Sequence, residues 1–322
     1  MARKFIIDTD TASDDAVALV MALRAPDVEV EAITIVNGNM PVAQGSRNAL
    51  YTAQMCGRAD VPVYIGADRP LMRPRVHAHW FHGEDGMGNQ FYPPPERQPE
   101  AKHGVQAIID TVRANPGIVM VTLGPLTNVA LAVRQAPDIV GKVSRCIVMG
   151  GAAGTTGNVT PAAEYNIWCD PEAARIAFHS GLPIEMVGWE VARGEANILA
   201  EEMEMIRGFG TPLARFAMDC NSHAYKATIE QSDDLGLGLY DPVAMAIALD
   251  PTICTYMSKH FVDVETQSEL TRGMTVVDRY DVTTDERNID VWRSVQEHGK
   301  DVSVCWSIDV RRWKELLYST LR

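Results

Sequence analysis

The sequence predicts one α/β domain, in which a mostly parallel, open β-sheet is flanked by helices and a small β-ribbon lies near the C-terminus. Short runs rich in Val and Ile alternate, over the first two thirds of the chain, with segments whose apolar residues recur at helical spacing. This alternation is typical of βαβ units around a buried parallel sheet. No repeat, low-complexity tract or linker interrupts the chain, so we expect a single domain over residues 1–322.

The expected elements follow one another in a regular order. Strands are predicted at 5–7, 28–36, 118–123, 143–149 and 184–187. Helices are predicted at 14–23, 44–55, 105–113, 126–133 and 171–179. The rhythm changes in the last third, where we expect helical structure over 211–229 and after Pro242, and a β-ribbon formed by 261–265 and 274–280. Two stretches without periodicity, 65–102 and 150–163, are long enough to be functional loops.

Composition excludes several classes of protein. The 29 Lys and Arg residues against 42 Asp and Glu residues give a formal net charge of −13, and no basic run is present, so a nucleic-acid partner is not expected. No apolar stretch approaches the roughly 20 residues that cross a bilayer. Asp8 and Asp10 interrupt the first apolar segment, and the six cysteines show no C-x-x-C spacing. We therefore expect a cytoplasmic protein with free thiols.

Four aspartates follow the first predicted strand within eight positions: Asp8, Asp10, Asp14 and Asp15. Ligands of open parallel sheets bind at the carboxyl ends of the strands, which is where these side chains are expected. A purely structural role, in which acids complement the dipole of a helix capped by Ser13, would account for Asp14 and Asp15. It would not account for Asp8 and Asp10. Clustered carboxylates repel unless a cation or protons neutralise them, and their oxygens suit Ca²⁺ or Mg²⁺ better than zinc.

Further motifs continue along nearly the whole chain. They are Asp8-Thr-Asp10-x-x-x-Asp14-Asp15, Gly38-Asn39, His82-Gly-Glu-Asp-Gly86, Leu123-Gly-Pro-Leu-Thr-Asn128, Val148-Met149-Gly-Gly151, Asn158 to Asn166, Asp170-Pro171, Asp241-Pro242 and Glu269 to Val277. In this order, the set resembles the inosine-uridine-type nucleoside hydrolases. The resemblance implies a Rossmann-like nucleoside hydrolase fold, a nucleoside substrate and a homo-oligomer, either a dimer or a tetramer.

The resemblance also implies a set of site residues. One Ca²⁺ per chain would be held by the side chains of Asp10, Asp15 and Asp241 and by the backbone carbonyl of Leu123. Ribose would be bound by Asp14, Asn39, Met149, Asn158, Glu164, Asn166 and Asp241. Fixed polar side chains of this kind suit a polyhydroxyl ligand.

The implied reaction is hydrolysis of the N-glycosidic bond, which gives a free base and ribose. Carboxylates stabilise an oxocarbenium-like sugar, the metal lowers the pKa of a bound water, and Asp10 is the expected general base. Many similar proteins have His where this chain has Tyr240, so the group that activates the leaving base is either Tyr240 or His82. Trp189, Tyr225 and His223 are further candidates for the base side of the pocket.

Two other functions are compatible with parts of the sequence. A strand ending in Asp8-x-Asp10 also fits a haloacid-dehalogenase-type phosphatase, although Ala12 stands where that pattern has Thr or Val. Tyr240 in place of His is compatible with a nucleoside- or ribose-binding protein that has little turnover. Release of ribose or of inorganic phosphate distinguishes these alternatives from the hydrolase.

Overall fold

A computed structural model describes residues 2–231, 235–288, 290–292 and 300–322 of the chain. Within these residues, nine strands form one sheet in the order β3-β2-β1-β4-β5-β6-β9-β7-β8. The parallel part consists of β3 (Val63–Ile65), β2 (Val28–Ile35), β1 (Arg3–Thr9), β4 (Ile118–Thr122), β5 (Val143–Met149), β6 (Ile184–Val187) and β9 (Lys300–Ile308). The antiparallel edge consists of β7 (Cys254–Val264) and β8 (Thr275–Val277). The predicted mostly parallel sheet is confirmed.

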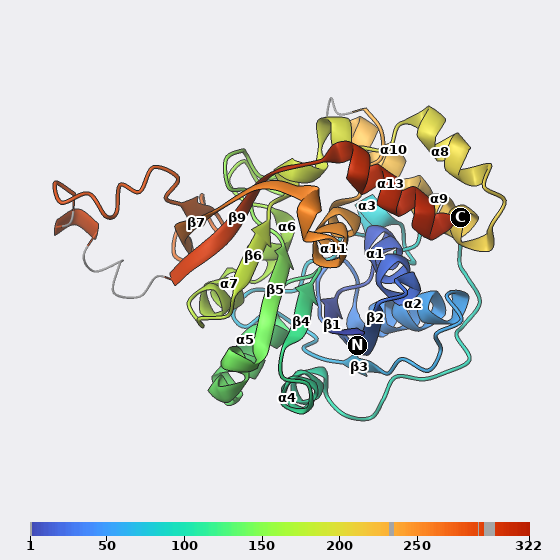
Figure 1. Cartoon of the computed structure of the whole chain (residues 1–322), viewed down its shortest axis with the longest axis horizontal. Helices are drawn as coiled ribbons and strands as arrows, with labels where there is room; N and C mark the ends of the chain where they lie inside the picture. The colour runs from blue at the N-terminus through green and yellow to red at the C-terminus, as the bar shows by residue number, and fades with distance from the viewer. Residues whose placement is uncertain (1, 232–234, 289, 293–299) are drawn as a thin grey trace.

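Helices cover both faces of the sheet (Figure 1). One core contains residues of α1 (Ser13–Arg24), α2 (Val42–Met55), α8 (Ala200–Arg207), α9 (Pro212–Cys220), α10 (Ser222–Gln231), α11 (Tyr240–Leu249) and α13 (Val310–Leu321). The other contains residues of α4 (Gly104–Ala114), α5 (Thr127–Gln135), α6 (Tyr165–Cys169) and α7 (Pro171–Phe178). Strand β1 contributes side chains to both cores, because Phe5 and Ile7 lie in the first core and Ile6 lies in the second. Alternating side chains of a strand point to opposite faces, so the segment 5–7 of β1, which is buried on both faces, must be apolar at every position.

The turn from β1 into α1 positions the first part of the site. The Asp15 carboxylate accepts a hydrogen bond of 2.9 Å from the Ala12 backbone N–H, which satisfies one of the donors left free at a helix start. Residues 13–23 are all buried, since α1 packs between α2 and α11. This burial explains the uninterrupted apolar run that follows Asp15.

The C-terminal third differs most from the sequence prediction. The β-ribbon forms, with Val262 opposite Val277, but it is not a separate unit. Strand β9 lies antiparallel to β7 and parallel to β6, so it joins the ribbon to the main sheet. The sequence prediction missed β9, α13 and the short β3. It also treated 211–229 as one helical stretch, which the structure divides at Asn221 into α9 and α10.

The two long loops both reach the same end of the sheet. The first, 65–102, contains a short helix, α3 (His79–His82), and the second, 150–163, follows β5. None of the helices in the part of the chain that the structure describes is long and apolar enough to cross a membrane.

Candidate active site

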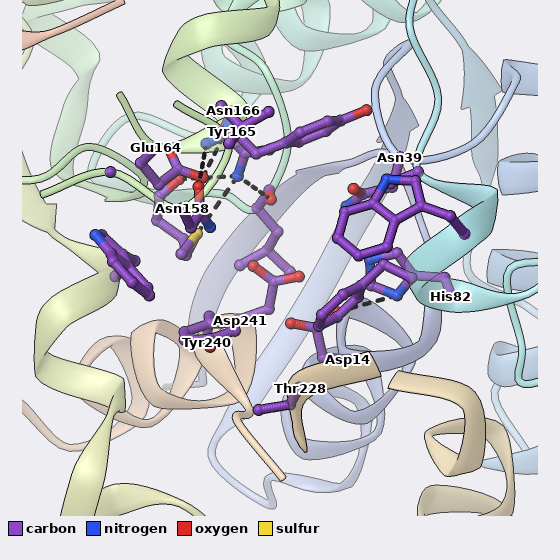
Figure 2. Close-up of a pocket in the computed structure, with 18 of the residues that line it drawn as sticks. Asp14, Asn39, His82, Asn158, Glu164, Tyr165, Asn166, Thr228, Tyr240 and Asp241 are labelled. Carbon is purple, nitrogen blue, oxygen red and sulfur yellow. Dashed lines mark hydrogen bonds and ion pairs between the residues drawn. The ribbon is translucent and has the colours of Figure 1, made fainter. Parts of the chain in front are cut away.

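A cavity of about 350 Å³ lies at the carboxyl ends of β1, β4 and β5 (Figure 2). Its walls come from segments far apart in the sequence, including the β1–α1 turn, the α3 loop, the loop after β5 and the start of α11. Most of the residues predicted for the site line it: Asp14, Asn39, His82, Leu123, Met149, Asn158, Glu164, Asn166, Tyr240 and Asp241. The fold therefore brings the sugar-binding and base-side candidates together, as expected for strand ends in an open α/β sheet.

Four buried carboxylates, those of Asp10, Asp14, Asp15 and Asp241, lie close together, and Asp14 and Asp241 among them line this cavity. Asp14, Asp15 and Asp241 each present an oxygen within 4.8 Å of the others. Burial, followed by the charges of Asp15 and Asp14, raises the pKa of Asp10 well above its usual value, and the pKa of Asp241 is raised for the same reasons. Such a group of oxygens is stabilised by a cation, so the residues present could hold a hard divalent metal ion.

The Asp10 carboxylate is closely surrounded by the backbone of Gly38, Asn39 and Gly124. Its Oδ2 accepts a hydrogen bond from the Asn39 backbone N–H, whereas its Oδ1 is buried and has no protein partner among the described residues. A Cβ at Gly38 would lie 1.9 Å from Oδ2, and one at Gly124 would lie 3.0 Å from Oδ1. Only glycine at position 38 lets the backbone approach the carboxylate this closely. The unpartnered oxygen fits a metal ion or a water molecule.

Asp8 does not belong to this cluster. Its side chain accepts a hydrogen bond of 2.8 Å from Asn128 Nδ2 and another from the Thr34 hydroxyl. Burial raises its pKa to about 7. Asp8 lies two residues after Ile6 on the same face of β1, toward α5, so strand alternation places it away from Asp15. The fourth carboxylate of the cluster is Asp241, which α11 supplies.

The opposite wall is built from the start of α6. Glu164 caps this helix: its Oε1 accepts from the Asn166 N–H at 2.8 Å and its Oε2 accepts from the Gly151 N–H at 2.9 Å. Burial raises the Glu164 pKa to about 7. Asn166 Nδ2 donates to the Leu123 carbonyl oxygen at 2.8 Å and lies 3.2 Å from that of Met149. Figure 2 shows Glu164 and Asn166 across the cavity from Asp14.

Two side chains were predicted to activate the leaving group, and the structure places both on the cavity. His82 Nδ1 lies 2.8 Å from Ser13 Oγ and 4.0 Å from Asp14 Oδ1. Burial, reinforced by His223 and His79, lowers the His82 pKa to about 3, so its imidazole is neutral near pH 7. Tyr240 begins α11, with its ring centroid 6.2 Å from that of Trp189.

The base side of the cavity differs in part from the prediction. Trp189 lines it, with its indole N–H donating to the Thr156 carbonyl at 2.9 Å. Tyr225 instead packs against the core, and His223 Nε2 contacts the Trp80 carbonyl at 3.1 Å, so neither lines this cavity. Sequence reasoning missed several of the lining residues, among them Trp80, Phe81, Arg193 and Thr228. The aromatic pair beside His82 was a usable signal; Arg193 and Thr228 belong to no recognisable motif.

The fold and the site together define an α/β enzyme with a carboxylate cluster beside a polar pocket for a small molecule. A sequence comparison makes this class specific. The chain belongs to the inosine-uridine preferring nucleoside hydrolase family, whose model matches residues 5–314. Members of this family hydrolyse the N-glycosidic bond of nucleosides. The match contradicts the phosphatase alternative and favours an enzyme over a binding protein.

Individual relatives cover the chain almost completely. The pyrimidine-specific ribonucleoside hydrolase RihA of Salmonella agona is 40% identical over 303 residues, which is 93% of this chain and 96% of that protein. Among solved structures, a plant nucleoside hydrolase, PpNRh1, is 31% identical, with a TM-score of 0.89 and coverage of 100% of this chain and 99% of its own. A purine-preferring ribonucleoside hydrolase from Gardnerella vaginalis is 32% identical, with a TM-score of 0.87 and coverage of 99% and 98%.

Proposed function

We propose that this protein is a Ca²⁺-dependent ribonucleoside hydrolase that releases a free base and ribose, with Asp10 as the general base. The observation that carries the proposal is the buried Asp10 Oδ1, which has no protein partner in the described residues and lies among three further buried carboxylates. A carboxylate oxygen without a protein partner, next to two carboxylates that line a polar cavity, is suited to take a proton from water.

The metal would be held by the carboxylates of Asp10, Asp15 and Asp241 and by the Leu123 carbonyl. Every donor in this set is an oxygen, and a crowded oxygen shell favours Ca²⁺ over the smaller Mg²⁺. The Leu123 carbonyl already accepts from Asn166, but a carbonyl oxygen has a second lone pair that a cation can use. When bound, Ca²⁺ would supply a positive charge that acidifies a water molecule and binds hydroxyl groups.

The sugar would lie between the two polar walls. Asp14 and Asn39 would orient the 2′- and 3′-hydroxyls from one side, and Asn158, Glu164 and Asn166 would hold the other side, with Met149 against the ring. Because the sugar becomes positively charged as the glycosidic bond breaks, carboxylates on both sides stabilise the transition state more than the bound substrate. Asp10 accepts the proton of the attacking water at its free oxygen.

Activation of the departing base is assigned to Tyr240. A neutral imidazole that already contacts Ser13 is poorly suited to donate a proton, so we assign His82 a positioning role next to Asp14. The phenol of Tyr240 can donate a hydrogen bond without being charged. RihA is named pyrimidine-specific and the Gardnerella enzyme purine-preferring, so nucleosides with either kind of base are candidate substrates.

The resemblance to the family also supports a homo-oligomer, and free cysteines support a cytoplasmic location. Light scattering on the purified protein tests the first of these proposals. A monomer at micromolar concentration would contradict it. Fractionation of the cells that produce the protein tests the second.

The function is tested by assaying ribose release from a panel of purine and pyrimidine ribonucleosides, with added Ca²⁺ and after removal of metal with a chelator. We expect turnover of at least one nucleoside, its loss on chelation, and its recovery with Ca²⁺. Elemental analysis of the active protein gives an independent reading of the metal. Full activity in protein shown to be free of divalent metal would reject the metal assignment, and no ribose release from any nucleoside would reject the hydrolase.

A further inference from the structure

Two of the six cysteines lie in contact at the junction of β7 and β9. The Sγ atoms of Cys254 and Cys305 are 3.1 Å apart, although the two residues are separated by 51 positions in the sequence. The β-ladder is irregular at this point, with register shifts on both sides of Tyr256. This irregularity brings together two thiols that do not face each other in the regular ladder.

The two thiols differ in access to solvent. Cys305 is fully buried, whereas Cys254 is partly exposed. The hydrogen bond between them lowers the pKa of Cys254 and, together with burial, raises the pKa of Cys305 far above its usual range. Cys254 is therefore the thiol that an oxidant in solution can reach and that ionises more readily. The Cys305 sulfur is close enough to react with a sulfenic acid formed on Cys254.

We propose that Cys254 and Cys305 form a reversible intramolecular disulfide when the protein meets a hydroperoxide. The Cys254 thiolate attacks one oxygen of the peroxide, the O–O bond breaks, and the other oxygen leaves as hydroxide or alkoxide. This leaving group takes up the proton that the Cys254 thiol released on ionisation and becomes water or an alcohol. The resulting sulfenic acid is attacked by the Cys305 sulfur, so an S–S bond forms, the S–O bond breaks and the Cys305 proton leaves with the hydroxide as water. Two thiols are oxidised and one peroxide is reduced.

The disulfide would connect β7 with β9, and β9 pairs with β6, the strand that precedes one wall of the active site. In β9, Cys305 lies opposite Val187 of β6, and β6 leads directly to Trp189 in the cavity wall. The new bond would close the loop between β7 and β9, which lowers the conformational entropy of the unfolded chain. We expect the oxidised protein to unfold at a higher temperature than the reduced one. The proposal does not depend on nucleoside hydrolysis.

The test treats the reduced, full-length protein with hydrogen peroxide, blocks the remaining thiols with iodoacetamide and maps the peptides by mass spectrometry. We expect a loss of about 2 Da, one linked peptide containing Cys254 and Cys305, and full reversal by dithiothreitol. The other four cysteines, Cys56, Cys146, Cys169 and Cys220, should stay reduced because they are buried.

Two variants make the result specific. Cys254→Ser removes the reachable thiol and should abolish the linkage, whereas Cys56→Ser, a change at a buried cysteine in another part of the fold, should leave it intact. The proposal is overturned if both thiols of the pair remain open to alkylation, after denaturation, under conditions that oxidise a small dithiol. It is equally overturned if Cys254→Ser still loses two thiols.

Discussion

Replacing Asp10 by Asn separates the proposed proton transfer from the architecture of the site. Asn has nearly the same shape as Asp, so an amide oxygen at the Oδ2 position can still accept the hydrogen bond from the Asn39 N–H. The position of Oδ1 would then carry an NH₂ group, which cannot take a proton from water. A general base contributes roughly 10²- to 10⁴-fold to the rate, which corresponds to about 3–5 kcal/mol of activation free energy. We expect kcat to fall by this factor, with a smaller change in KM.

Asp8→Asn is the matched control for this measurement. Asp8 is also a buried aspartate of the same segment, but it faces Asn128 and Thr34 rather than the cavity. Both variants are assayed for ribose release in saturating Ca²⁺, and their metal content is measured. A near-normal kcat in metal-loaded Asp10→Asn would refute the role of Asp10 as general base. An equal fall in Asp8→Asn would mean that the loss follows from removing any buried charge in this region.

Three further predictions follow from the same site. Ribonucleosides lacking the 2′-hydroxyl should show a kcat/KM at least about 100-fold lower, because contacts to Asp14 and to the metal are lost together; equal values would contradict the proposed placement of the sugar. Tyr240→Phe should slow ordinary nucleosides but leave p-nitrophenyl riboside nearly unaffected, since that leaving group needs no proton; an equal effect on both substrates would exclude Tyr240 as the donor. Burial raises the Glu164 pKa from 4.5 to about 7, so the ionised form is less stable in the folded protein and the free energy of unfolding should fall as pH rises through this range. In chelator, Glu164→Gln should lack this component, which amounts to about 3 kcal/mol at most, and urea unfolding at pH 5 and pH 8 measures the difference.

Much of the fold could be predicted from local patterns. The alternation of apolar runs with helix-period segments identifies β1, β2, β4, β5 and β6 because each strand is buried on both faces and each helix must cover one of them. Strand β9 was not predicted from these patterns. It is bordered by β6 and β7, which are distant in sequence, and short-range periodicity carries no information about such pairing.

The aspartate cluster shows most clearly which features follow from the sequence and which depend on the tertiary structure. The sequence by itself determines that Asp8, Asp10, Asp14 and Asp15 stand at the end of a buried strand, and hence at a ligand-binding edge. The family resemblance already implied Asp241, but without it only the tertiary structure decides which carboxylates meet. Strand alternation turns Asp8 toward Asn128, while the packing of α11 on α1 brings in Asp241 from more than 200 residues away. Proximity of this kind depends on how helices pack across the whole sheet, and no local spacing in the chain encodes it.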